Sequence, residues 1–125
     1  MIVERYVSFE AAQLLEKKGF DGDYSRTYTR NGELKSFDYD IFYPAPTIQT
    51  AAEWLRVKKG FYVYAGLDID YDEDENGVKY YHDPLYYGNI VRTNDGEQMY
   101  DGGEMYDQPE YAVEAMIRYC LENLI

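Results

Sequence analysis

The residues best suited to chemistry lie in one acidic stretch of the sequence, LDIDYDEDENGVKYYHD, which runs from Leu67 to Asp83. Six of its first nine residues carry a carboxylate, and Asn76-Gly77 follows directly. Carboxylate oxygens are ligands that Ca²⁺ prefers, and a dense group of them also attracts basic partners. The stretch is therefore open to three interpretations: a calcium loop, a protein-binding surface or a solvated turn.

The calcium interpretation depends on spacing, because a calcium loop takes its ligands from fixed positions and has glycine at the sixth. Counted from Asp72, the ligands would be Asp72, Asp74, Asn76 and Asp83. Against this, Lys79 would bring a positive charge close to the ion, and the last position is aspartate rather than a bidentate glutamate. Strands rather than helices are expected on both sides, and Asn76-Gly77 is also typical of a hairpin turn. Calcium binding is kept as an alternative.

A protein-binding face is the preferred interpretation. Asp68, Asp70 and Asp72 alternate along a predicted strand, which would place them on one side about 6.6 Å apart at each step. That spacing is close to the roughly 7 Å between successive phosphates of a nucleic-acid strand. The residues expected to bind the partner are Asp68, Asp70, Asp72, Glu73, Asp74, Glu75, Tyr62, Tyr64, Tyr80 and Tyr81. The expected partner is a basic protein surface, and one version of the hypothesis is a nucleic-acid mimic or inhibitor that occupies a DNA-binding groove of a host protein.

The distribution of charge favours a partner over a merely solvated strand. Residues 1–66 hold nine acidic and nine basic side chains, whereas residues 67–125 hold fifteen acidic and three basic ones, which accounts for the whole net charge of −12. A one-sided negative field repels nucleic acid and membrane surfaces, so neither is expected as a direct partner. The opposite interpretation is that the charges only keep an edge strand from aggregating and that the acidic face has no function.

Catalysis is not expected. The nucleophiles and the base that the chain offers are few: Ser8, Ser25, Ser36, Cys120 and His82. Nucleophilic catalysis needs a nucleophile, a base and a group that orients the base. Ser8 is expected to cap a helix and Cys120 to lie on the apolar side of the last helix, while His82 is expected to be structural or exposed. The chain also contains no phosphate loop, no dinucleotide fingerprint and no zinc motif, so no cofactor is expected.

Length and composition indicate one domain over residues 1–125, and a cytoplasmic protein is expected. A single cysteine excludes an internal disulfide and fits a reducing compartment. No stretch of 18 apolar residues occurs. Tyrosine accounts for 16 residues, and such rings are suited to half-buried sheet faces and protein-binding surfaces.

Alternation and helix signals predict an α+β fold: an antiparallel sheet of four or five strands with three helices on one face, in the order α-β-β-α-β-β-(β)-α. Ser8 should cap the first helix and Gly19 end it; Pro46 or Thr47 should begin the second and Gly60 end it. The last helix should begin at Pro109. A return strand after Asn31-Gly32 would carry Phe37, Tyr39, Ile41 and Tyr43. A long strand from Phe61 should turn Leu67, Ile69 and Tyr71 inward.

Two segments, APTIQTAAEWLRVKKGFYVYAG and PEYAVEAMIRYCLENLI, carry a resemblance to known proteins. The chain resembles a group of small uncharacterised proteins of phages and mobile elements of gut anaerobic bacteria, in which Pro-Thr-hydrophobic-Gln, Trp-Leu-Arg and an ending near Tyr-Cys-Leu-Glu-Asn recur. Here these motifs begin at Pro46, Trp54 and Tyr119. The resemblance covers roughly a third of the chain and implies an accessory binding protein in a phage-type setting. It carries over no functional residue.

Overall fold

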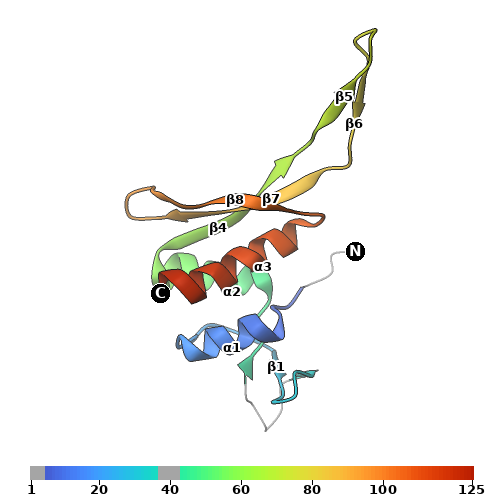
Figure 1. The fold of residues 1–125 in the computed structure, drawn as a ribbon. Coiled ribbons are helices and arrows are strands. Elements are labelled where there is room, and N and C mark those ends of the chain that lie inside the picture. Colours follow the sequence, from blue (N-terminus) through green and yellow to red (C-terminus); the bar gives the residue numbers. More distant parts are fainter. Residues whose placement is uncertain (1–4, 37–42) are drawn as a thin grey trace.

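The computed structural model describes residues 5–36 and 43–125, with the side chains at 101 and 102 left out. Figure 1 shows the elements in order along the chain. The helices are α1 (Phe9–Lys17), α2 (Ile48–Trp54) with a π-helical extension η1 (Leu55–Lys59), and α3 (Pro109–Tyr119) with a π-helical extension η2 (Cys120–Leu124). The strands are β1 (Arg26–Tyr28), β2 (Leu34–Ser36), β3 (Tyr43–Pro44), β4 (Phe61–Asp68), β5 (Tyr71–Glu73), β6 (Lys79–Tyr81), β7 (Leu85–Arg92) and β8 (Gln98–Tyr106).

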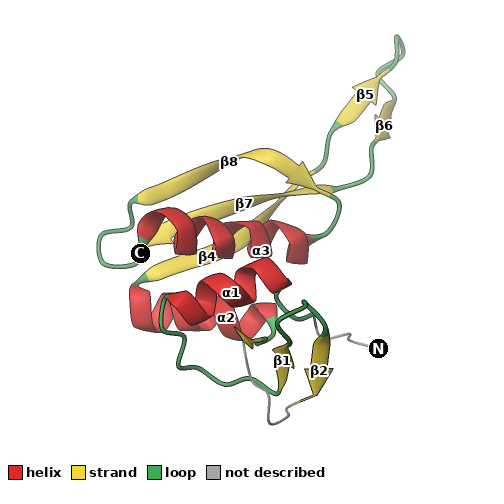
Figure 2. Ribbon diagram, turned by 60° about the horizontal axis from the view of Figure 1, so that its bottom comes forward, coloured by secondary structure: helices red, strands yellow, loops and turns green. Residues whose placement is uncertain are grey.

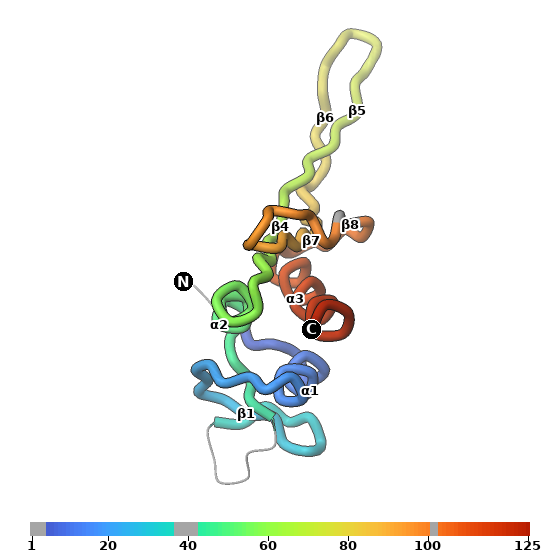
Figure 3. Tube along the Cα trace, turned by 90° about the vertical axis from the view of Figure 1, so that its left-hand side faces the viewer, coloured from blue at the N-terminus to red at the C-terminus, as the bar shows by residue number. Residues whose placement is uncertain are grey.

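The predicted α+β class is confirmed, with three α-helices and antiparallel sheets among the described residues. The single sheet of four or five strands is replaced by three smaller ones, in the orders β2-β1-β3, β4-β7-β8 and β5-β6. One reason is visible in Figure 3, where the helices separate the small N-terminal sheet from β4-β7-β8. The predicted positions Phe37, Tyr39 and Ile41 lie outside the described residues.

The helix boundaries agree with the sequence predictions. The Ser8 hydroxyl caps α1 by accepting the backbone N–H of Ala11, and Thr47 caps α2 in the same way by accepting that of Thr50. Gly60 adopts the left-handed conformation that ends the second helix, with φ of 79°. Pro109 lies in the first turn of α3, where its missing N–H costs nothing.

The core forms between the helices and one face of the β4-β7-β8 sheet. Figures 2 and 3 show α2 and α3 on this face, with α2 beneath the β4 side. Val63 and Ile90, which pair across β4 and β7, are buried there with Leu55, Met116 and Ile117. The helix α1 lies on the same side of the sheet as α2 and α3, one layer further from it.

The long strand predicted from Phe61 is interrupted. β4 ends at Asp68 and β5 begins at Tyr71, and the chain then projects far from the sheet as a two-stranded hairpin (Figure 1). Leu67, Ile69 and Tyr71 are 55%, 47% and 42% exposed, so the predicted inward face is wrong. The alternation of apolar residues was present, but none of the described helices extends far enough to cover this part of the chain (Figure 2).

Candidate functional site: the acidic hairpin

The projecting segment from Leu67 to Leu85, called the acidic hairpin below, contains most of the residues predicted to bind a partner. Its turn is set by Asp74, whose Oδ1 accepts the backbone N–H groups of Asn76 and Val78, each at 2.9 Å. Gly77 completes the turn with φ of 81°, a conformation that glycine adopts without strain. The hydrogen bond from the Val78 N–H, helped by those from Asn76 and Tyr80, lowers the pKa of Asp74. The predicted Asn-Gly turn is thus present and is held by a carboxylate.

The two faces of the acidic hairpin differ in chemistry. Since directly opposite residues share a face, the pair Asp72–Tyr80 lies on one side and the pairs Tyr71–Tyr81 and Glu73–Lys79 lie on the other. On the first face, the Asp72 carboxylate is 3.0 Å from Nε2 of His82, and the Tyr80 hydroxyl donates to Asp74 at 3.2 Å.

On the second face the rings of Tyr71 and Tyr81 lie 5.6 Å apart, and the Lys79 ammonium is 4.7 Å from the centre of the Tyr71 ring. One side therefore carries Asp72 with Tyr80, and the other carries two adjoining tyrosine rings beside the Glu73–Lys79 pair. Tyr80 and Tyr81, predicted together beside the acidic row, lie on opposite sides.

The predicted row of evenly spaced aspartates is wrong. Asp68 is the last residue of β4, Asp70 lies in the connection, and Asp72 belongs to β5. Asp70 also uses its Oδ1 to accept the N–H of Tyr71 at 2.9 Å. Because the strand is interrupted between them, the three carboxylates do not form a single strand face. Glu73 and Glu75 are exposed in β5 and in the turn, so the negative field of the hairpin itself remains.

The acidic hairpin also exposes more apolar surface than the sequence analysis predicted, which named only Tyr80 and Tyr81 in this segment. Twelve large apolar side chains are exposed among the described residues, and seven of them belong to this segment. They are Leu67, Ile69, Tyr71, Val78, Tyr80, Tyr81 and Leu85. A two-stranded hairpin is marginally stable alone in water, and clustered exposed apolar side chains mark interaction sites. The alternation of apolar and polar residues gave no signal of this exposure, because it does not contain how far the helices extend over the sheet.

Tyr62 and Tyr64 lie apart from the hairpin, in β4, where they alternate with the buried Phe61 and Val63 and therefore face away from the core. Their rings stack at 5.2 Å with an interplanar angle of 23°. The structure therefore divides the predicted binding residues between the acidic hairpin and an aromatic pair on the open sheet face.

The geometry gives the calcium hypothesis no support. Asp74 uses Oδ1 for the turn and Oδ2 for the Tyr80 hydroxyl, and Asp72 pairs with His82. Across residues 5–36 and 43–125, no group of three or more His, Cys, Asp or Glu side chains is arranged to hold a metal ion. Asn76 and Asp83 are exposed at the turn and after β6.

The candidate nucleophiles are not brought to the only histidine. Ser8 caps α1, Cys120 is fully buried in the core, and His82 is on the projecting hairpin beside Asp72. Burial raises the pKa of the Cys120 thiol to about 12, which disfavours the reactive thiolate.

In comparisons with known proteins, no protein-family model, no curated protein and no solved structure matches the chain. The resemblance to phage and mobile-element proteins therefore stays a prediction. In the described part of the chain, no helix has the length and apolar character needed to cross a bilayer. The fold and the site together define an α+β protein with a projecting acidic hairpin.

Proposed function

We propose that this protein is a non-catalytic binding protein whose acidic hairpin docks on a basic surface of another protein. The observation that carries the proposal is the hairpin itself: it extends away from the core, and it exposes seven large apolar side chains among carboxylates. Apolar contact area supplies binding energy, and the surrounding charge steers a basic partner and selects it. In the setting that the resemblance implies, the partner is a host protein in the bacterial cytoplasm.

The two faces of the hairpin suggest how such a partner would be bound. Tyr71 and Tyr81 offer ring surface on one side, and aromatic residues are enriched at the centres of protein interfaces. Asp72 offers charge on the other side, and Asp70 adds charge in the connection that leads to β5. A basic groove that closes around the hairpin would meet both. A nucleic-acid-binding groove is one such surface, although the interrupted row of aspartates removes the argument from phosphate spacing.

The test uses two variants with the same change in net charge. The first carries Asp68→Asn, Asp70→Asn and Asp72→Asn, which keep the shape of the side chains. The control carries Glu16→Gln, Asp23→Asn and Glu122→Gln, which are exposed carboxylates elsewhere on the molecule. Each protein is immobilised and used to capture binding proteins from host lysate at low and at high salt.

The proposal expects a basic protein that binds the wild type and the control at low salt, is released at high salt, and does not bind the hairpin variant. Adding Tyr71→Ser with Tyr81→Ser should also release it. If the hairpin variant retains the partner, or if no basic partner binds the wild type at low salt, the proposal is wrong. Equal loss in both charge variants would show that net charge alone attracts the partner.

A further inference from the structure

A second surface lies along the β4 edge of the β4-β7-β8 sheet. Among the described residues, β4 pairs with β7 alone, and this pairing runs without a register shift from Phe61 to Asp68. The outward-facing N–H and C=O groups of β4 therefore form a regular, unpaired edge, which is a template for another strand. The opposite edge is different, because the pairing of β8 with β7 contains two register shifts, and such irregularities discourage strand addition.

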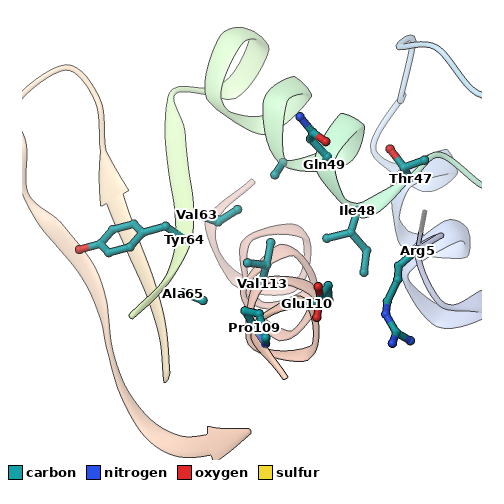
Figure 4. A pocket seen from close by; sticks show the side chains of 11 residues that line it. Arg5, Thr47, Ile48, Gln49, Val63, Tyr64, Ala65, Pro109, Glu110 and Val113 are labelled. Carbon is teal, nitrogen blue, oxygen red and sulfur yellow. The ribbon is translucent and has the colours of Figure 1, made fainter. Parts of the chain in front are cut away.

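Two adjoining hollows follow this edge. The first has a volume of about 470 Å³ and lies between β4, α2 and the start of α3 (Figure 4). Its apolar lining includes Ile48, Ala52, Val63, Ala65 and Val113. The second, of about 500 Å³, continues along α2 and shares Gln49, Ala52 and Val63 with the first. The two hollows together are called the β4 groove below. Their size is in the range of sites that bind ligands.

One polar atom in the groove has no partner. Glu110 lines the first hollow from the start of α3, and its Oε2 is buried without a hydrogen-bond donor from any described residue. A buried carboxylate oxygen without a donor is costly. Arg5 lines the same hollow, but its guanidinium donates a 3.3 Å hydrogen bond to Oε1 of Gln108 and lies over the ring of Tyr111. It forms no ion pair with Glu110. A ligand that brings a cation would satisfy this oxygen.

We propose that the β4 groove binds an extended peptide segment of another protein, which pairs with β4 as an added strand and places a lysine or arginine at Glu110. Three features fit this occupant together. The free edge offers the ladder of backbone hydrogen bonds, the apolar hollows accept alternate side chains, and the unpartnered carboxylate accepts the cation. A second copy of this chain would also fit the edge, but each copy carries a net charge of −12 and would repel the other.

The experiment is an NMR titration of the full-length, isotope-labelled protein with capped synthetic heptapeptides. Each peptide alternates valine with threonine and carries one lysine. The peptides of the set differ in the sequence position of this lysine, so that together they place it at every position. A matched set has glutamate in place of the lysine. The expected result is a shift of the backbone amides of Phe61–Asp68 and of α2 with the lysine set, and binding about tenfold weaker with the glutamate set.

Strand addition is tested separately with N-methylated versions of the best peptide. Methyl groups on the peptide N–H groups that face β4 should abolish binding, whereas methyl groups on the alternate N–H groups should leave it unchanged. Glu110→Gln should remove the preference for lysine over glutamate, and Glu16→Gln should keep it. Ala52→Phe, which fills both hollows, should weaken every peptide.

Several results would overturn the proposal. It would be wrong if no peptide of either set shifted the β4 amides at millimolar concentration. It would also be wrong if the shifts fell on residues 71–81, or if N-methylation had no effect on either side of the peptide. A variant with Asp70→Asn, Asp72→Asn and Glu73→Gln, which all lie outside β4, should bind the peptides like the wild type, which keeps this test independent of the function proposed above.

Discussion

The ring of Tyr87 lies over Gly66, directly opposite it in the β4–β7 pair, so closely that a Cβ atom at position 66 would stand 2.2 Å from the ring Cζ. The next pair along these strands faces the other side of the sheet. There a Cβ atom at Gly88 would stand 2.4 Å from Cγ of Met116 in α3. Two glycines in neighbouring cross-strand pairs thus allow a tyrosine to cover one face and a methionine to pack on the other.

Gly88→Ala should destabilise the protein more than Gly66→Ala. Met116 is 2% exposed and enclosed by the core, so an added methyl group at position 88 must displace its side chain from a well-packed position. Such overpacking lowers the free energy of unfolding by about 1–3 kcal/mol. Tyr87 is only half-buried and can turn toward solvent. The measurement is the free energy of unfolding from urea denaturation. An equal loss in the two variants, or a larger one for Gly66→Ala, would show that the open sheet face is packed as tightly as the core.

Asp21 should contribute to the loss of stability in acid. The indole Nε1 of Trp54 donates a 2.7 Å hydrogen bond to Asp21, and this bond lowers the pKa of the carboxyl below its ordinary 3.8. A lowered pKa stabilises the fold above the ordinary value, and the contribution disappears as pH falls through the lower, folded-state pKa. In Asp21→Asn the melting temperature should therefore fall less steeply below about pH 4. Trp54→Phe removes the donor instead and should flatten the slope too, so a wild-type slope in either variant contradicts the interpretation.

Asp95, in the turn between β7 and β8, should titrate far below an ordinary aspartate. The Nε of Arg92 donates a 3.1 Å hydrogen bond to Asp95, and the backbone N–H of Glu97 donates another. These bonds, that from Arg92 most of all, lower the pKa of Asp95 to about 2. The carboxylate therefore supports the fold above pH 3.8, and this support is lost as pH falls through about 2. Carboxyl NMR should show the pKa moving up toward 3.8 in Arg92→Met. The pKa of Asp74, measured in the same sample, should not move, because its donors belong to another turn.

The sequence predicted the local structure well and the long-range arrangement poorly. Ser8, Thr47 and Gly60 act through their own neighbours, so the helix boundaries could be predicted from residue type and spacing. Whether the side chains of Ile69 and Tyr71 are buried depends on how far the helices extend over the sheet, and no local sequence pattern contains that information. The sequence could not show that Asp74 accepts the backbone hydrogen bonds of the turn, because a carboxylate two residues before Asn76 is equally compatible with a calcium loop.

Calcium should not stabilise the protein. A bound ion raises the free energy of unfolding according to its concentration relative to its dissociation constant. Here the oxygens of Asp74 already accept hydrogen bonds from Asn76, Val78 and Tyr80. The melting temperature in millimolar Ca²⁺ should therefore equal that in a sodium chloride solution of the same ionic strength. A rise that is specific to Ca²⁺ and lost in Asp72→Ala would restore the calcium hypothesis.

Cys120 should be unreactive in the folded protein. Its side chain has no exposed surface and lies between the apolar residues of the core, and burial raises the pKa of the thiol to about 12. At about pH 8 the thiolate, which is the nucleophile, is then nearly absent, and a reagent cannot reach the sulfur without an opening of the helix. A disulfide reagent should modify Cys120 slowly in buffer and at once in denaturant. The slow rate should increase when Gly88→Ala loosens the packing of the neighbouring Met116. Fast modification of the native wild type would instead indicate an accessible thiol and would reopen the question of a catalytic cysteine.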